Sequence, residues 1–211
     1  MTPRQPRVHD LIRFDADVLD VALPAWVTRD HGDVWAVVRR QAASRPEAVS
    51  AGVRGRRRAE RKAIEVDRGA VRGVVTPESL AIADGSDLGH AGIAAALLAI
   101  ATSALFGDRP WGPVGSTGFE LASGLSAVHA DSDLDVVVRA DRRIPLLEAL
   151  AIQKALTDLP CRVDCLLETP SGGIALAEWA TDSGGRSVLL RTADGPRLTP
   201  DPWASVERMT S

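Results

Sequence analysis

One stretch of the chain, residues 113–140, combines a glycine turn with closely spaced aspartates. Gly115 and Ser116 lie near its start, and Asp133 and Asp135 stand one residue apart shortly before three consecutive valines. The valines are typical of a buried strand. Because side chains alternate along a strand, the two aspartates are expected on the same face. Adjacent carboxylates repel each other unless a cation lies between them, so the pattern predicts an acidic pair that binds a cation.

The residue types around this pair indicate phosphate chemistry. Mg²⁺ prefers oxygen ligands and usually binds one or two protein carboxylates together with substrate phosphates. A strand-to-helix turn at Gly115 and Ser116 would present backbone N–H groups to a phosphate. A third aspartate, Asp164, lies within another short apolar run, where a carboxylate without a partner is costly. Together these features resemble the nucleotidyltransferase superfamily and predict Asp133, Asp135 and Asp164 as magnesium ligands and catalytic residues.

Each of these signals is weak alone. An isolated Asp-x-Asp at the start of a strand is more often a solvated turn than a metal site. Asp164 also has two possible roles, since it could complete the metal site or accept a proton from an incoming hydroxyl.

The order of expected elements predicts an α+β fold with mixed strand pairing. A smaller α+β domain is expected at residues 1–88, with its boundary in the glycine-containing segment 85–89. A nucleotidyltransferase-like domain with a mixed sheet and helices is expected at residues 89–211. The expected elements are a polar arm at 1–13, strands at 34–40 and 49–55, a helix at 56–66, a helix start at Thr76, a buried helix at 91–106, the turn at 115–116, a strand from Asp133, a helix at 145–159, a strand around Asp164, a helix at 174–181 and a strand at 187–191.

Composition excludes several classes of protein. The chain of 211 residues can bury a real core, and its formal charge of −3 does not suggest a nucleic-acid partner. The apolar residues 91–106 fall short of the roughly 20 needed to cross a bilayer, and the N-terminus lacks an apolar signal core. We therefore expect a cytoplasmic protein without membrane contact. Cys161 and Cys165 have no paired Cys/His spacing and are expected to fill the core rather than bind zinc.

Almost all of the 25 Lys and Arg residues are Arg, which favours planar contacts to phosphate or carboxylate. Arg54 adjoins Gly55 and an expected helix start, a place where anions bind. Arg39 and Arg40 end a strand nearby in the sequence. We predict that these three arginines hold phosphates. A solvated helix face is the preferred interpretation for three other cations: Arg57, Arg61 and Lys62.

No arrangement of Ser, His and Asp has a spacing that supports nucleophilic hydrolysis. His9 is expected to be structural and His129 to face solvent. A dinucleotide-binding fingerprint is also absent, because neither Gly-x-x-Gly segment has the third glycine in register.

Motifs spread along nearly the whole chain carry a more specific resemblance. They lie at residues 35–40, 52–63, 115–121, 132–135, 168–179 and 189–192. The chain resembles the malonate decarboxylase holo-acyl-carrier-protein synthases, also called phosphoribosyl-dephospho-CoA transferases. The spacing from Gly115 to Asp133 is longer than in minimal nucleotidyltransferases, which separates it from antibiotic-modifying and antitoxin-type members.

The resemblance implies an enzyme that uses triphosphoribosyl-dephospho-CoA. Such an enzyme attaches the prosthetic group to a serine of the malonate decarboxylase acyl carrier protein and releases diphosphate. Mg²⁺ would be the cofactor, and Gly115 and Ser116 would hold the leaving diphosphate. Two alternatives remain open: a nucleotidyltransferase that uses ATP or another nucleotide on a protein or small molecule, and a non-catalytic module that binds the carrier protein.

Overall fold

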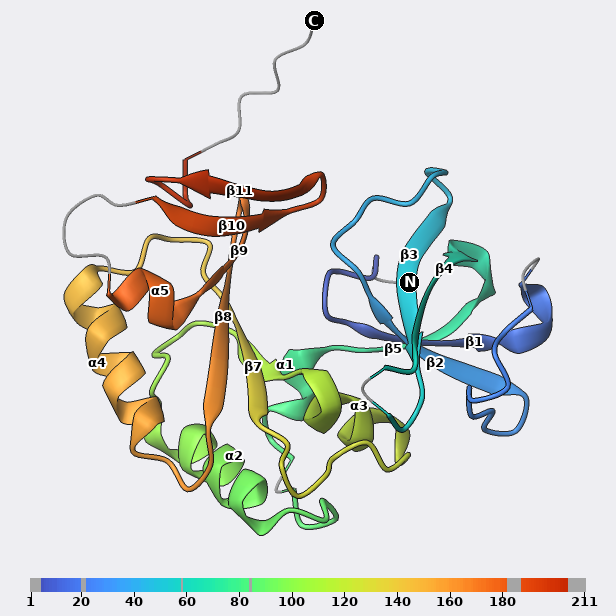
Figure 1. Cartoon of the computed structure of the whole chain (residues 1–211), viewed down its shortest axis with the longest axis horizontal. Coiled ribbons are helices and arrows are strands. Elements are labelled where there is room, and N and C mark those ends of the chain that lie inside the picture. The colour runs from blue at the N-terminus through green and yellow to red at the C-terminus, as the bar shows by residue number, and fades with distance from the viewer. Residues whose placement is uncertain (1–4, 20–21, 58, 84, 182–186, 205–211) are drawn as a thin grey trace, which may run out of the picture.

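The computed structural model describes residues 5–19, 22–57, 59–83, 85–181 and 187–204. Two β-sheets lie side by side in these residues, and the longer helices accompany the second sheet (Figure 1). This arrangement confirms the expected α+β class.

The first sheet is antiparallel, with strand order β4-β3-β2-β1-β5. Its strands are β1 (Leu11–Asp15), β2 (Asp33–Val38), β3 (Ala48–Arg54), β4 (Arg61–Asp67) and β5 (Val71–Val75), with 3₁₀ turns at Ala16–Val18 and Arg68–Ala70. The strands expected at 34–40 and 49–55 are confirmed. Strands β1 and β5 were not expected from the sequence.

The helix expected at residues 56–66 is wrong, because β4 occupies most of it. Arg61 pairs with Arg54 and the pairing continues to Asp67, which faces Ala48. Ile64 and Val66 enter the core on one face of the strand, while residues 61, 63 and 65 lie on the other. This two-residue alternation is the signature of a strand.

The second sheet has the order β11-β10-β9-β8-β7-β6 and is mixed, since only β7 and β8 are parallel. Its strands are β6 (Trp111–Pro113), β7 (Leu134–Arg139), β8 (Val163–Thr169), β9 (Gly172–Ala175), β10 (Val188–Thr192) and β11 (Gly195–Thr199). The helices are α1 (Pro77–Leu80), α2 (Ala91–Ser103), α3 (Gly115–Ser123), α4 (Leu146–Thr157) and α5 (Leu176–Ala180).

Most of these elements match the expectations. Thr76 caps α1 as predicted, because its side chain accepts a hydrogen bond from the Ser79 N–H. The helix expected at 174–181 is partly wrong: β9 continues to Ala175 and only the five residues of α5 are helical. The hairpin strand β11 was not expected.

Strand β7 is buried on both faces, which explains its run of valines. Val136 and Val138 pack into the main core with residues of α2 and α4. Val137 is equally buried on the opposite face, which is the face that also carries Asp135 and Arg139. This second face is turned toward the first sheet, since Arg139 donates to the Val8 carbonyl at 3.1 Å.

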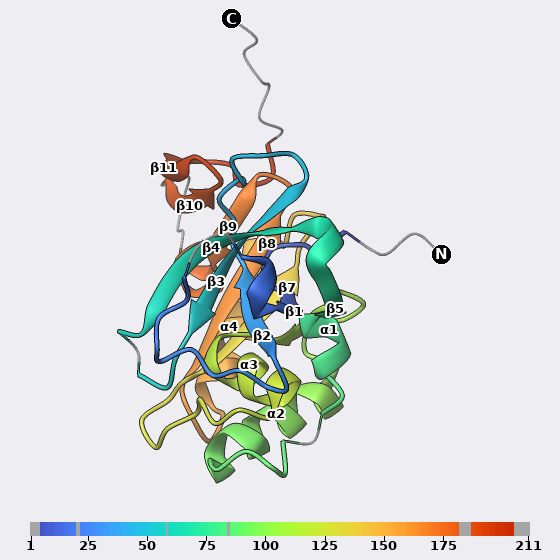
Figure 2. The same ribbon diagram turned by 90° about the vertical axis from the view of Figure 1, so that its right-hand side faces the viewer.

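The two sheets share an apolar seam. A buried cluster joins Leu11 of β1 to Leu80 of α1, Phe119 of α3 and Ala127. Figure 2 shows the first sheet lying in front of β7 and β8. At the edge of the seam, a Cβ placed on Gly112 of β6 would lie 1.8 Å from the carbonyl oxygen of Pro77. The backbones of β6 and α1 therefore touch directly. Helix α1 lies before the predicted domain boundary at 85–89, yet it packs on β6 and α3.

Polar contacts also tie the sheets together. Arg139 pairs with Glu78 at 2.8 Å. His9, whose backbone is left-handed at φ 75°, donates from Nε2 to Glu168 of β8 at 2.8 Å. Arg40 donates from Nη1 to the same carboxylate at 2.7 Å, and a second bond from its Nη2 makes the pair bidentate.

Candidate active site

The predicted aspartates gather at one end of the parallel strand pair. Asp135 on β7 and Asp164 on β8 are register partners, and Asp133 directly precedes β7. Burial raises the pKa of Asp135, and the negative charges of Asp164 and Asp133 raise it further. The three carboxylates are therefore close enough to repel one another. We call this face of β7 and β8 the acidic wall.

An arginine already lies between two of these carboxylates. Arg162 Nη1 is 3.6 Å from Asp133 Oδ2, and Arg162 Nη2 is 3.1 Å from Asp164 Oδ2. The Arg162 side chain is 69% exposed and can leave this position at low cost. Within the described ranges, no group of three or more His, Cys, Asp or Glu residues is arranged to hold a metal ion. A site of two carboxylates completed by substrate oxygens remains compatible with the geometry.

The glycine turn approaches the acidic wall closely. β6 ends at Pro113 and α3 begins at Gly115, as the sequence predicted. Gly115 has φ +62°, and a Cβ there would lie 2.0 Å from Asp135 Oδ2, so only glycine fits. Helix α3 has no side-chain cap at Val114. Its first N–H groups, including that of the half-buried Ser116, can therefore face an anion.

A cavity of about 460 Å³ lies between this turn and the first sheet. We call it the inner cavity. Its lining comes from the strands of the first sheet, from residues next to them and from the start of α3, and it includes His9, Val37, Arg39, Arg54, Arg61 and Gly115. The face of β3 and β4 that carries Arg54 and Arg61 is called the basic wall.

Arg54 fits the predicted role of an anion ligand. Its guanidinium lies 5.3 Å from the centre of the Phe119 ring, and its buried Nε has no hydrogen-bond partner. Burial lowers the pKa of Arg54, and the nearby charge of Arg61 lowers it further, whereas Asp135 and Glu120 act in the opposite direction. A cation held here without a direct partner is suited to receive an anionic ligand.

Arg61 is a site residue that the sequence did not indicate. It was expected on a solvated helix, but it lies on β4, opposite Arg54 in register, and lines the inner cavity. Its charge also acts to lower the pKa of Asp135. The alternation of apolar and polar residues over 61–67 was the available signal. With respect to the described residues, the guanidinium groups of Arg39 and Arg61 form no hydrogen bond or ion pair.

Arg40 lies apart from the other predicted arginines. Its guanidinium is held by Glu168, and a Cβ on Gly173 would lie 2.6 Å from Arg40 Nη2. Burial alone would raise the pKa of Glu168, but the hydrogen bonds from His9 and Arg40 lower it to about 2. Arg40 thus joins the two sheets, and its donors are largely used. His9 has the structural place that the sequence suggested.

His129 precedes Asp133 in the sequence and contacts the turn between β3 and β4 of the first sheet. Its ring donates from Nε2 to the Arg56 carbonyl at 2.9 Å. It therefore links the loop before β7 to the β3–β4 turn.

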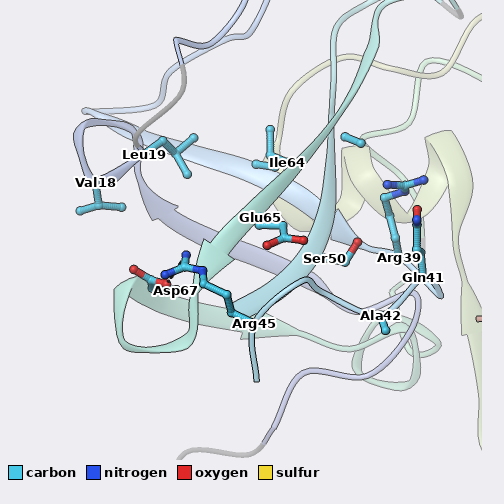
Figure 3. A pocket seen from close by; sticks show the side chains of 11 residues that line it. Val18, Leu19, Arg39, Gln41, Ala42, Arg45, Ser50, Ile64, Glu65 and Asp67 are labelled. Carbon is cyan, nitrogen blue, oxygen red and sulfur yellow. Dashed lines mark hydrogen bonds and ion pairs between the residues drawn. The ribbon is translucent and has the colours of Figure 1, made fainter. Parts of the chain in front are cut away.

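A further cavity, of about 390 Å³, opens on the first sheet (Figure 3). Figure 3 shows Arg39 and Gln41 at one end of it and Arg45 with Asp67 at the other. Arg45 pairs with Asp67 at 3.0 Å, and Glu65 accepts hydrogen bonds from Ser44 at 2.6 and 2.7 Å. Because its lining carries two carboxylates and its Arg45 is paired, this cavity is less suited to phosphate than the inner cavity.

Comparison with known proteins identifies the family. The chain matches the model of the phosphoribosyl-dephospho-CoA transferase MdcG N-terminal domain over residues 7–77 and that of the C-terminal domain over residues 81–202. No solved structure matches it. Within the residues described, no helix is long and apolar enough to cross a membrane.

Curated relatives carry the same family name over almost their full length. A phosphoribosyl-dephospho-CoA transferase of Azotobacter vinelandii is 38% identical over 209 residues, which cover 95% of this chain and 96% of the relative. Those of Pseudomonas aeruginosa and Klebsiella pneumoniae are each 37% identical, covering 96% and 94% of this chain and 96% of each relative. The chain therefore belongs to the phosphoribosyl-dephospho-CoA transferase family and is a transferase.

Proposed function

We propose that this enzyme attaches the phosphoribosyl-dephospho-CoA group to a serine of the malonate decarboxylase acyl carrier protein. The donor is 2′-(5″-triphosphoribosyl)-3′-dephospho-CoA and the other product is diphosphate. One observation carries the proposal. Arg54 and Arg61, which have no ion pair with a described residue, line the inner cavity together with Gly115, and Asp135 of the aspartate cluster lies directly against Gly115, as a phosphate donor with a cation would require.

The reaction is a displacement at the α-phosphorus of the donor. The serine oxygen forms a bond to this phosphorus, and the bond from phosphorus to the oxygen that bridges to the β-phosphate breaks. The electron pair leaves with diphosphate, and the serine proton passes to a base. Asp164 is exposed at the mouth of the acidic wall and can accept this proton, although it can equally complete a metal site.

The leaving diphosphate would be held from the opposite side. Gly115, Arg54 and Arg61 line the inner cavity, and the N–H groups of Gly115 and Ser116 lie at the uncapped start of α3. These donors would stabilise the charge that develops on the leaving group. Arg39 borders the same cavity and would contact a more distant phosphate.

Mg²⁺ suits the donor set of the acidic wall. Asp133 and Asp135 would hold it, with Asp164 as a third ligand if it does not act as the base. The position of Arg162 between Asp133 and Asp164 supports the binding of positive charge at this wall. When bound, the ion would supply positive charge that neutralises the phosphate oxygens.

The alternative of an ATP-dependent nucleotidyltransferase uses the same groups. Both reactions displace diphosphate from an α-phosphorus, so the acidic wall cannot distinguish them. Discrimination must come from contacts to the dephospho-CoA portion, which ATP lacks.

The decisive experiment incubates the enzyme with apo carrier protein, Mg²⁺ and either the triphosphoribosyl donor or ATP at equal concentration. Mass spectrometry of the carrier protein then gives the initial rates. We expect a mass increase on serine with the donor and little or none with ATP. Equal rates with the two donors would overturn the substrate assignment, and no modification with either would overturn the carrier protein as acceptor.

A further inference from the structure

A second, larger cavity continues from the inner cavity along the gap between the two sheets. It has a volume of about 1280 Å³, and we call it the outer cavity. His9, Arg39 and Arg61 line both cavities, so the two adjoin each other. The far side is formed by the β10–β11 hairpin. Six residues represent its lining: Arg39, Arg40, Arg61, Leu166, Leu189 and Arg191.

The hairpin contributes an arginine that has no role in the site described above. Val188 and Leu190 of β10 are buried in the core, so Leu189 and Arg191 lie on the other face, toward the outer cavity. Arg191 is exposed, and its guanidinium makes no hydrogen bond or ion pair with any residue that the structure describes. In contrast, Arg139 and Arg143 in the same domain are paired with carboxylates.

The balance of charge in the outer cavity favours an anion. Among the described residues that line it, Asp194 is the one with an acidic side chain. Arg40 is neutralised by Glu168, which leaves Arg39, Arg61 and Arg191 as three cations without carboxylate partners in the described chain. Leu166 and Leu189 add apolar surface beside them. A ligand that combines phosphate with an aliphatic chain matches this lining.

The donor of the proposed reaction has two anionic groups. Its triphosphate reacts at the acidic wall, while a diphosphate within the dephospho-CoA portion links the adenosine to the pantetheine chain. Drug-sized ligands occupy cavities of about 300–1,000 Å³. The inner cavity of about 460 Å³ is therefore too small for a donor of this length. The remainder must extend into a neighbouring space. The cavity on the first sheet also adjoins the inner cavity at Arg39, but its lining carries Glu65 and Asp67, so the outer cavity is better suited to an anionic ligand.

We propose that the outer cavity binds the dephospho-CoA diphosphate and its pantetheine chain, with Arg191 as a specificity residue. This inference rests on the proposed function, because it assigns a place to part of the same donor. It explains how the enzyme selects its donor over ATP: ATP fills the inner cavity only and leaves Arg191 without a ligand.

Dephospho-CoA without the triphosphoribosyl group is the direct probe. Its binding to the wild-type enzyme, to Arg191→Ala and to Arg197→Ala is measured by calorimetry. Arg197 is the matched control, because it is exposed on β11 of the same hairpin but does not line the cavity. We expect Arg191→Ala to weaken dephospho-CoA binding at least about tenfold, as loss of one charge-assisted phosphate contact does. Arg197→Ala should bind like the wild type.

A second probe separates the two cavities. Inorganic triphosphate with Mg²⁺ should bind Arg191→Ala and the wild-type enzyme equally, since it occupies the inner cavity. The KM for the full donor should rise in Arg191→Ala by about the same factor as the dephospho-CoA dissociation constant, with kcat nearly unchanged. Equal affinities of Arg191→Ala and Arg197→Ala for dephospho-CoA would overturn the inference, and so would equal weakening of triphosphate.

These binding measurements need no carrier protein. If dephospho-CoA binding depends on Arg191 and the carrier protein stays unmodified, the proposed function fails and the inference stands. If the carrier protein is modified and Arg191→Ala binds dephospho-CoA like the wild type, the inference fails and the proposed function stands.

Discussion

The acidic wall and the basic wall differ in how their charges are balanced. On the acidic wall, Arg162 is paired with Asp133 and Asp164, whereas Asp135 has no ion pair with a described residue. On the basic wall, Arg54 and Arg61 stand opposite each other in register, and with respect to the described residues neither has an ion pair. Like charges gathered in this way oppose folding. Each wall is therefore suited to an opposite charge that the ligand supplies: a cation on one side and phosphates on the other.

The two walls come from different halves of the chain, so neither half alone carries the candidate site. The acidic wall comes from the second sheet and the basic wall from the first. The charges of Arg61 and Arg54 lower the pKa of Asp135, and the charge of Asp135 raises the pKa of Arg54. The charges are thus coupled before any ligand binds, and the spacing of the two sheets sets the strength of the coupling.

The largest effect is expected from removing charge from the acidic wall. Asp133→Asn and Asp135→Asn should each lower the transfer rate about a thousandfold, because the amide cannot stabilise a bound cation. The melting temperature should not fall, since the substitution relieves repulsion between carboxylates. Initial rates and thermal melts give the measurement, with the exposed Asp131→Asn as control. Substantial activity in Asp133→Asn or Asp135→Asn would end the assignment of that residue.

The next largest effect is expected from breaking the ion pair between Arg40 and Glu168, which joins the two sheets. Glu168→Gln removes the partner of Arg40 and should lower the free energy of unfolding by about 3 kcal/mol, because the Glu168 carboxylate is only 9% exposed. Glu148→Gln is the control: it breaks the half-exposed pair with Arg109 and should cost less than about 1 kcal/mol. If denaturant titrations gave equal losses of unfolding free energy for Glu168→Gln and Glu148→Gln, a special role for the Arg40–Glu168 pair would be contradicted.

The same variant has a defined pH dependence. The pKa of Glu168 lies at about 2, below its ordinary value of 4.5. A lowered pKa stabilises the folded state above pH 4.5, and this contribution is lost as the pH falls from 4.5 toward 2. The stability difference between the wild type and Glu168→Gln should therefore shrink over this range.

On the basic wall, Arg54→Ala should weaken binding of the triphosphate donor roughly ten- to hundredfold. Arg57→Ala makes the same change of charge three residues away, at an exposed position outside the cavity lining, and should have little effect. Affinities from calorimetry or competition compare the two. Equally small effects would mean that the basic wall is only a solvated surface.

The smallest effect tests the arginine of the acidic wall. Arg162→Ala removes a cation that competes with Mg²⁺ and should raise metal affinity in the absence of donor by up to about fivefold, as befits an exposed pair. Arg142→Ala, which breaks the exposed pair with Asp108, is the control. Mn²⁺ binding followed by electron paramagnetic resonance reports the change. Weaker binding in Arg162→Ala would show that Arg162 supports the ion rather than replacing it.

Local patterns in the sequence predicted much of the second sheet and the acidic wall. The valines of β7 and the Asp-x-Asp before them lie within a few residues of one another, so alternation alone indicated their arrangement. The helical interpretation of 56–66 failed because abundant arginines suggested a polar helix face and concealed a strand that pairs with β3.

Contacts between distant residues could not be predicted in this way. Arg40 and Glu168 are 128 residues apart in the sequence. Nothing near Arg40 in the sequence indicates whether it pairs with a carboxylate of β8 or binds a phosphate. The inferred role of Arg191 likewise depends on the fold, which brings the β10–β11 hairpin and Arg39 to the same cavity. Such roles depend on the packing of the two sheets, which the sequence pattern does not contain.

The contact between Gly112 and Pro77 limits how the two halves of the chain can change. Here the separation of β6 and α1 is set by main-chain atoms, with no side chain between them to shrink or grow. Substitutions elsewhere along the seam can alter its chemistry while this spacing stays the same. A methyl group at position 112, however, would push α1 outward and draw Leu80 from the shared cluster. The absence of a side chain at Gly112 thus fixes the distance between β6 and α1.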